Sequence, residues 1–396
     1  TKIINNRNLH GINMKIKQLA AMVAVLASTS TYAAIETSAG TANVDLRLRY
    51  ESVSQDNALE DASALTLRTV ANFKTKSKEG FYGFVELENS IALIEDYNNA
   101  IGDNTEYSVI ADPATTELDQ AYVGYSANGL SVKLGRQVIT MDGHRFVGHV
   151  GWRNDKQTFD AISATYAASE KLKLSGAYIT KRNRIFADEK DFDSSDILLN
   201  AALTTDFGKV TGYAYLLDQD EGSVIDTYGA SLNGKASAIS YKIELATQTT
   251  ETAAGAEYDT SYFAVEGGTK LGPVMVKAGY ESLGSDDGMA GFATPLATLH
   301  KFNGWSDQFL GTPAQGLNDF YATVAGKFSG GKYAVTFHSY SADEASDTVD
   351  DLGSEINAVF NTKVSGFPLG VKAAVYSAGD IKVDTTKVWL WTGYKF

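Results

Sequence analysis

Apolar and polar residues alternate one by one over most of this chain. In residues 44–51, Val44, Leu46 and Leu48 alternate with aspartate and arginine. A period of two is that of a β-strand, which sends successive side chains to opposite faces. Eighteen segments of this kind can be counted, and the last covers residues 387–396. The pattern therefore predicts an all-β protein.

The segments between the predicted strands alternate in length. Every second connection is a short turn rich in Gly, Ser or Asn, as at residues 126–129. The connections between these turns are longer and often acidic, as at residues 89–116, 136–155, 183–195, 284–317 and 341–352. Short turns at one end and long loops at the other are typical of outer-membrane barrels. We predict a transmembrane, antiparallel, up-and-down β-barrel of 18 strands, with 16 as the alternative, short periplasmic turns and long extracellular loops.

The polar face of the predicted strands carries too many charges for a packed core. The charged residues on this face include Arg47, Arg49, Arg68, Glu86, Glu88, Lys133, Lys173 and Lys242. Either this face is the outside of a soluble β-sandwich, or it lines a wet lumen. The C-terminus favours the lumen, because Tyr394 and Phe396 form an ending that resembles the assembly signal of outer-membrane barrels. Aromatic residues near strand ends, among them Trp389 and Trp391, are expected in the outer aromatic girdles.

The N-terminal part of the chain has the features of a secretory signal. Residues 14–33 contain a basic start, an apolar core and small residues before the expected cleavage after Ala33. Residues 1–13 precede Met14 and are interpreted as upstream residues outside the natural protein. The sequence thus predicts a single barrel domain at residues 34–396 in the bacterial outer membrane. Its expected partners are the barrel-assembly machinery, membrane lipid and lipopolysaccharide.

Composition narrows the function further. The 396 residues include 48 acids, 34 Lys and Arg, and no cysteine, for a formal charge of −14. This balance argues against a nucleic-acid binder, and the lack of cysteine excludes thiol chemistry. His144 and His149 lack the glutamate of a zinc-protease motif. We therefore expect no enzyme, no cofactor and no metal site, although the acidic loops could gather Ca²⁺.

An 18-stranded barrel is too wide for side chains to fill, so it should pass a hydrophilic solute. Two readings of its arginines stay open. Arg47, Arg49 and Arg68, with Arg145 and Arg153 in a loop long enough to enter the lumen, could attract anions. They could instead brace the wall, with Glu86 and Glu88 pairing across strands. The loop at 284–317 is expected to fold into the barrel mouth as a lid, through His300, Lys301, Phe302 and Trp305.

Two stretches, residues 134–160 and 292–319, resemble the alginate-export-type porins of Gram-negative bacteria. The resemblance implies an 18-stranded outer-membrane barrel and transport, with anionic polysaccharide such as alginate as one substrate class. Many such proteins are uncharacterised porins for small solutes or oligosaccharides. The alternative function is a structural or adhesin-like barrel with a loop-plugged lumen.

Overall fold

The computed structural model describes residues 34–396, and the predictions for residues 1–13 and 14–33 lie outside this range. Eighteen long strands form the barrel. Their bounds are β2 (Gly40–Gln55), β3 (Ala62–Thr75), β4 (Phe81–Asp96), β5 (Thr115–Ala127), β6 (Leu130–Gln137), β7 (Thr158–Ala167), β8 (Leu172–Asn183), β9 (Phe192–Thr205), β10 (Gly208–Asp218), β11 (Val224–Ala236), β12 (Ile239–Glu251), β13 (Glu257–Leu271), β14 (Val274–Leu283), β17 (Leu317–Phe328), β18 (Gly331–Ser341), β19 (Asp351–Val364), β20 (Phe367–Ser377) and β21 (Thr385–Lys395).

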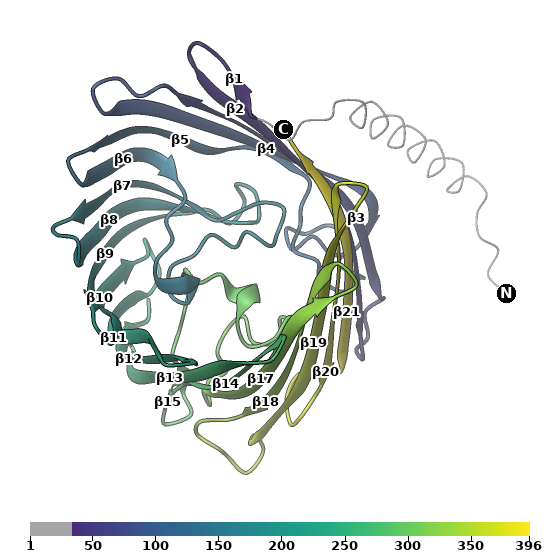
Figure 1. The fold of residues 1–396 in the computed structure, drawn as a ribbon. Coiled ribbons are helices and arrows are strands. Elements are labelled where there is room, and N and C mark those ends of the chain that lie inside the picture. The colour runs from purple at the N-terminus through teal and green to yellow at the C-terminus, as the bar shows by residue number, and fades with distance from the viewer. Residues whose placement is uncertain (1–33) are drawn as a thin grey trace, which may run out of the picture.

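Each of these strands is antiparallel to the next along the chain, and β21 pairs with β2 to close the barrel. The closing register sets Arg49 opposite Trp391 and Tyr50 opposite Leu390. Figure 1 shows the closed ring viewed along its axis. A short strand, β1 (Ile35–Glu36), pairs with the start of β2. The prediction of an 18-stranded antiparallel barrel is confirmed, and the 16-stranded alternative is wrong. Among the described residues, no helix is both long and apolar enough to cross a membrane.

The two ends of the barrel differ in their connections. At one end the strands turn within a few residues, as at Asn128–Gly129 between β5 and β6 and at Ser329–Gly330 between β17 and β18. All four of these residues have positive φ. This conformation matches the right-handed twist of a hairpin and favours Asn and Gly. The long connections lie at the other end.

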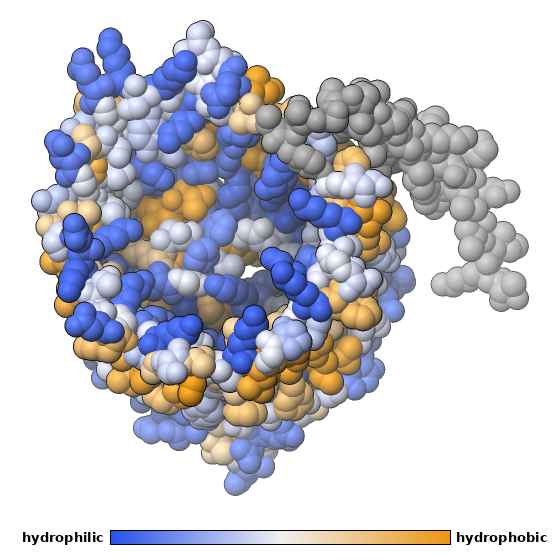
Figure 2. Space-filling model, viewed as in Figure 1, coloured by the Kyte–Doolittle hydropathy of each residue, from blue (hydrophilic) through white to orange (hydrophobic). Residues whose placement is uncertain are grey.

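The outer surface of the strands is apolar. Leu134, Val123 and Leu245 expose 62%, 60% and 56% of their surface. Their neighbours in sequence point inward and are polar or small, because side chains alternate along a strand. Figure 2 shows hydrophilic residues around and within the hollow of the barrel. The polarity is therefore the reverse of that of a water-soluble domain.

Three long connections, here named loops A, B and C, contribute residues to the interior. Loop A is residues 97–114, loop B is residues 138–157, and loop C is residues 284–316. Loop B contains the short helix η1 (Asp142–His144), and loop C contains β15 (Ser285–Asp286), β16 (Ala290–Gly291) and η2 (Leu299–Lys301). Figure 1 shows loops B and C inside the ring.

Loops B and C share an apolar core with the barrel wall. A parallel bridge joins Val147 to Leu296. The Phe146 ring lies 5.1 Å from Tyr262 of β13 and 5.9 Å from Phe292 of loop C, measured between ring centroids. These apolar residues are buried on the inner side of the barrel, where the strands alone would offer mostly polar groups. Apolar residues of loops B and C thus form a hydrophobic core inside the lumen.

Candidate functional site: the barrel lumen

All three inward loops meet at Arg153 of loop B. Its Nη1 lies 3.1 Å from Glu51 of β2 and 3.4 Å from Asp112 of loop A. Its Nη2 lies 3.0 Å from Asp307 of loop C. Burial alone would lower the pKa of Arg153, but Glu51, Asp112 and Asp307 raise it. Because the guanidinium is always charged and carries several donors, it can join three carboxylates from three segments.

The predicted wall arginines hold loops A and B. Arg49 of β2 is buried and donates to the carboxylate of Asp112 and to the carbonyl of Trp152. Arg47 Nη2 donates to Asn154 Oδ1 at 3.0 Å. The pKa of Asp112 is lowered, because Arg49 and further arginines outweigh the effect of burial. Arg49 is therefore a brace between wall and loop, with no surface left for a passing solute.

Glu86 and Glu88 do not form the ion pairs with Arg68 on the neighbouring strand that the wall-bracing hypothesis would need. Glu86 and Glu88 instead lie 2.7 and 3.4 Å from Lys156 of loop B. Arg68 has its ion pair with Asp45, at 3.7 Å. The acids of β4 thus bind a loop, whereas Arg68 of β3 pairs with the neighbouring strand β2.

Arg145 fixes loop B to the opposite wall and to loop C. Its Nε lies 2.7 Å from Glu281 of β14, and its Nη2 donates to Asn303 of loop C at 3.2 Å. The guanidinium also lies over the ring of Phe302, 4.8 Å from its centroid. Arg145 is 2% exposed. One of the two open hypotheses had Arg145 and Arg153 attract anions from a loop that enters the lumen. The loop does enter the lumen, but both side chains are buried in ion pairs.

His300 of loop C lies between a carboxylate and an ammonium group. Its Nδ1 is 2.6 Å from Asp307, and its Nε2 is 2.6 Å from Nζ of Lys372 in β20. Lys387 of β21 contacts Asp307 at 2.9 Å. Burial and Lys372 lower the pKa of His300 to about 3, although Asp307 acts in the other direction. A neutral imidazole fits this geometry, since Nδ1–H can donate to Asp307 while Nε2 accepts from Lys372.

All four tryptophans of the chain gather in the lumen around Lys372. Its Nζ lies 4.1, 3.9 and 5.0 Å from the ring centroids of Trp152, Trp305 and Trp389. Trp391 lies 5.4 Å from Trp152. The expectation that Trp389 and Trp391 belong to an outer girdle is wrong. Outward-facing Val388 and Leu390 alternate with them, so both indoles must point inward.

The remaining wall of the lumen carries a row of lysines. Five alternate strands each place one lysine on the inner face, here named the lysine row: Lys133 of β6, Lys173 of β8, Lys209 of β10, Lys242 of β12 and Lys277 of β14. Lys301 approaches them from loop C. Burial and the charges of Lys242 and Lys277 lower the pKa of Lys301. The ammonium groups of Lys242, Lys277 and Lys301 are therefore close enough to repel one another.

Two cavities lie along the lysine row. The larger, of about 540 Å³, is lined by Lys209, Lys242 and Lys277 with the lid residues Lys301 and Trp305, and also by the acids Asp142, Glu244, Glu266, Glu281 and Asp319. Lys242 and Lys277 lie 2.7 and 2.8 Å from Glu244 and Glu266. The smaller, of about 370 Å³, is lined by Lys133, Lys173 and Lys209. Lys209 and Asp142 line both, so the cavities adjoin. Asp142 is the one acid that lines the smaller cavity, against three lysines.

Lys133, Lys173 and Lys242 were predicted from the sequence to line the pore, whereas Lys209 and Lys277 were not. Both missed lysines lie on the polar face near the start of a strand that follows a short turn, as the named three do. That repeated position could have revealed the row. The assembly role proposed for Tyr394 and Phe396 stays a prediction.

A family model described as "Alginate export" matches residues 39–281. The chain belongs to the alginate export family. A search of curated proteins found no match.

The fold is that of the Occ and Opd outer-membrane porins. OccAB1 of Acinetobacter baumannii is 13% identical with a TM-score of 0.71, over 90% of this chain and 96% of its own. OccK9 (OpdG) of Pseudomonas aeruginosa is 16% identical with a TM-score of 0.69, over 91% and 98%. OpdK of the same organism, solved with vanillate, is 12% identical with a TM-score of 0.67, over 90% and 98%. This member of the alginate export family thus has a porin-like outer-membrane channel fold.

Proposed function

We propose that this protein is a passive outer-membrane channel for small anionic solutes, with sugar acids as the favoured class. The observation that carries the proposal is the lysine row along two adjoining cavities. Lysines on five alternate strands place a row of ammonium groups along which a carboxylate can pass. Glu244 and Glu266 pair with Lys242 and Lys277, whereas Lys133 and Lys173 have no ion pair among residues 34–396, so the excess of positive charge lies at the smaller cavity. Positive charge in a low-dielectric passage raises the local concentration of anions.

The size of the passage favours small solutes over a polymer. Each cavity has the volume typical of a small-molecule site. Loops A, B and C are fixed by buried ion pairs, so widening the lumen would separate buried opposite charges. OpdK, a protein of the same fold, was solved with vanillate, which is a small carboxylate. The export of alginate itself would require these loops to leave their places.

The second candidate function is a structural barrel with a sealed lumen. It is favoured by the three loops that occupy the interior and by their buried braces. Under either function we expect the mature protein, after removal of residues 1–33, to reside in the outer membrane, and we expect no enzymatic activity. Lipid, lipopolysaccharide and the assembly machinery stay its proposed partners.

Uptake into proteoliposomes separates the two functions. We expect glucuronate to enter faster than glucose, which is similar in size but uncharged. A three-lysine variant (Lys133→Gln, Lys173→Gln, Lys209→Gln) should lose this difference. The matched control removes three exposed turn lysines (Lys76→Gln, Lys78→Gln, Lys171→Gln) and should behave as the wild type. Liposomes that admit neither solute would support the sealed barrel.

A further inference from the structure

The larger of the two cavities has an aromatic side in addition to its charges. Tyr321 of β17 lines this cavity and stands directly opposite Gly279 of β14 in the register of the sheet. A methyl group at Gly279 would overlap the tyrosine ring, so the ring lies against the bare backbone of β14. Tyr321 therefore forms a flat aromatic surface on the inner wall, and this surface borders the cavity.

The same pairing of an aromatic residue with an opposite glycine occurs at three further places on the inner wall: Tyr82 with Gly124, Tyr213 with Gly229 and Trp391 with Gly370. Inward loops cover two of these rings, since Phe146 lies 5.4 Å from Tyr213 and Trp152 lies 5.4 Å from Trp391. Among the four aromatic residues, only Tyr321 lines one of the two cavities along the lysine row. It is thus the ring that a solute in these cavities can contact.

Loop C adds two further aromatic residues, Phe302 and Trp305, to the lining of the same cavity. The guanidinium of Arg145 lies 4.8 Å from the centroid of Phe302, and Nζ of Lys372 lies 3.9 Å from that of Trp305. Both cations are buried, so they hold the two rings in place beside the cavity. Aromatic rings from the wall and from the loop together suit a solute that itself contains a ring.

One positive charge of the larger cavity has no carboxylate beside it. The other cationic side chains of the lining each face an acid, in the pairs Arg145–Glu281, Lys209–Asp142, Lys242–Glu244, Lys277–Glu266 and His338–Asp319. Lys301 of loop C instead donates to the carbonyl oxygen of Gly143 at 2.7 Å, and it has no ion pair among residues 34–396. The cavity therefore offers one ammonium group to one carboxylate.

Groups that bind hydroxyls surround the ring of Tyr321. Glu266 accepts a hydrogen bond of 2.7 Å from the tyrosine hydroxyl. The hydroxyl groups of Thr323 and Thr336 lie 2.9 Å apart and line the same cavity. A ring that carries hydroxyl groups can bond to these side chains, whereas a purely apolar ring would displace water from them without compensation.

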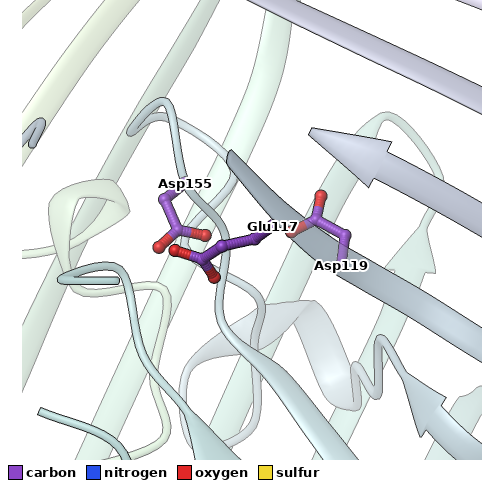
Figure 3. Close-up of side chains that lie close together, drawn as sticks. All are labelled: Glu117, Asp119 and Asp155. Carbon is purple, nitrogen blue, oxygen red and sulfur yellow. The ribbon is translucent and has the colours of Figure 1, made fainter. Parts of the chain in front are cut away.

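Another part of the lumen repels a carboxylate. Glu117, Asp119 and Asp155 lie together at β5, as Figure 3 shows, and the neighbouring cation Lys156 is already in contact with Asp119. An anion is therefore directed away from this part of the lumen and toward the lysine row.

We propose that the larger cavity is a binding subsite for a cyclic sugar acid, in which Tyr321 stacks on the sugar ring and Lys301 binds the carboxylate. The inference rests on the proposed function and adds a preference among anions to it. Lys301 favours any monocarboxylate, whereas Tyr321 favours those that contain a ring. The smaller cavity, with three lysines and one acid, attracts anions of any shape.

Reduction of the KCl current through the channel by an added solute, measured in planar bilayers, tests the proposal. Glucuronate and gluconate have the same number of carbon atoms and the same charge, but gluconate is an open chain. We expect glucuronate to halve the current at a concentration about fivefold lower than gluconate, the size of effect expected of one aromatic contact. Benzoate, which has a ring but no hydroxyl groups, should bind more weakly than glucuronate.

Gly279→Ala should displace the tyrosine ring from the wall, and so remove the advantage of glucuronate while leaving the block by gluconate unchanged. The matched control is Gly267→Ala on the adjacent strand β13, where an added methyl group meets no other atom, and it should behave as the wild type. Neither glycine has a positive φ, so alanine strains neither backbone. Lys301→Gln should weaken the block by both solutes to a similar extent. A misfolded channel would not lose the block by one solute alone.

Equal half-blocking concentrations of glucuronate and gluconate would overturn the subsite, as would a Gly279→Ala channel that keeps the difference between them. Benzoate that binds as tightly as glucuronate would overturn the assignment to a sugar acid. In these cases the anion channel would still stand on the uptake of glucuronate and its loss in the three-lysine variant. A wild type that neither binds nor admits any of these anions would contradict the proposed function and the subsite together.

Discussion

The lumen has two sides that use similar residues for different purposes. On the side of β2, β20 and β21, charged residues of the wall pair with charged residues of the inward loops. Arg153, for example, joins three carboxylates and is 6% exposed. On the side of β6 to β14, the lysine row borders open cavities. Lys242 and Lys277 are paired there with Glu244 and Glu266, whereas Lys133 and Lys173 have no ion pair among the residues that the structure describes. Lys209 keeps 47% of its side chain exposed, and its ion pair with Asp142 is 3.6 Å long.

The difference shows that the role of a charged residue in a pore depends on which groups lie next to it. A charged group with fixed, opposite neighbours is neutralised and holds a loop in place. One with solvent beside it keeps a field that a solute can feel.

Removing the guanidinium of Arg153 should have the largest effect. Arg153→Ala leaves Glu51, Asp112 and Asp307 buried with fewer partners, which costs about 3–5 kcal/mol for a broken buried pair. We expect the loops to leave the lumen, so that single-channel conductance rises. Tryptophan emission should shift to the red, since all four tryptophans lie in this region.

Arg184→Ala is the control for that experiment, because Arg184 directly follows β8 and takes no part in the ion pairs of Arg153. It should keep the conductance and the emission spectrum of the wild type. If Arg153→Ala left both unchanged as well, the braces would not be what holds the loops.

Acid should loosen the braced side through His300. Its pKa of about 3 in the folded protein lies below the ordinary value of about 6.5, so protons favour the undocked loop. The stability contributed by neutral His300 is complete above pH 6.5 and falls as the pH drops toward 3. At pH 5 the loss should be about 2 kcal/mol, at about 1.4 kcal/mol per pH unit. The pKa of Asp307 is lowered well below its usual range, so this carboxylate stays charged in that window.

Tryptophan emission between pH 7.5 and pH 5 measures the effect. His300→Asn, which keeps a hydrogen-bonding side chain but cannot be protonated, should flatten the pH dependence. An unchanged slope in this variant would assign the acid response to another group.

The open side should tolerate loss of charge. We expect Lys173→Gln to change the free energy of unfolding, measured by urea titration in lipid vesicles, by less than about 0.5 kcal/mol, the range of ordinary surface substitutions. The same substitution should lower the preference for anions. A destabilisation of several kcal/mol would show instead that Lys173 is a brace.

Much of the fold follows from local patterns in the sequence. The alternation of side chains and the alternation of connection lengths predict 18 strands and their order, because both depend on neighbouring residues. The inward position of Trp389 and Trp391 was also open to prediction from the parity of Val388 and Leu390. The outer-girdle prediction relied on the aromatic character of the two residues and not on the alternation of faces along the strand.

The partners of the charged residues could not be predicted in this way. Arg49 and Asp112 are 63 positions apart, and Arg145 and Glu281 are 136 apart. Only the path of the loops through the lumen brings them together. The contacts of Lys156 with Glu86, Glu88 and Asp119 likewise need the docking of loop B, which leaves no regular spacing in the sequence.

The reversal potential across a salt gradient tests the central claim most directly. In planar bilayers with unequal KCl concentrations, the wild type should show a potential of the sign expected for anion preference. The three-lysine variant should move toward zero or to the opposite sign, while the turn-lysine control stays with the wild type. A cation-preferring wild type, or a potential that the three lysines do not affect, would contradict the account.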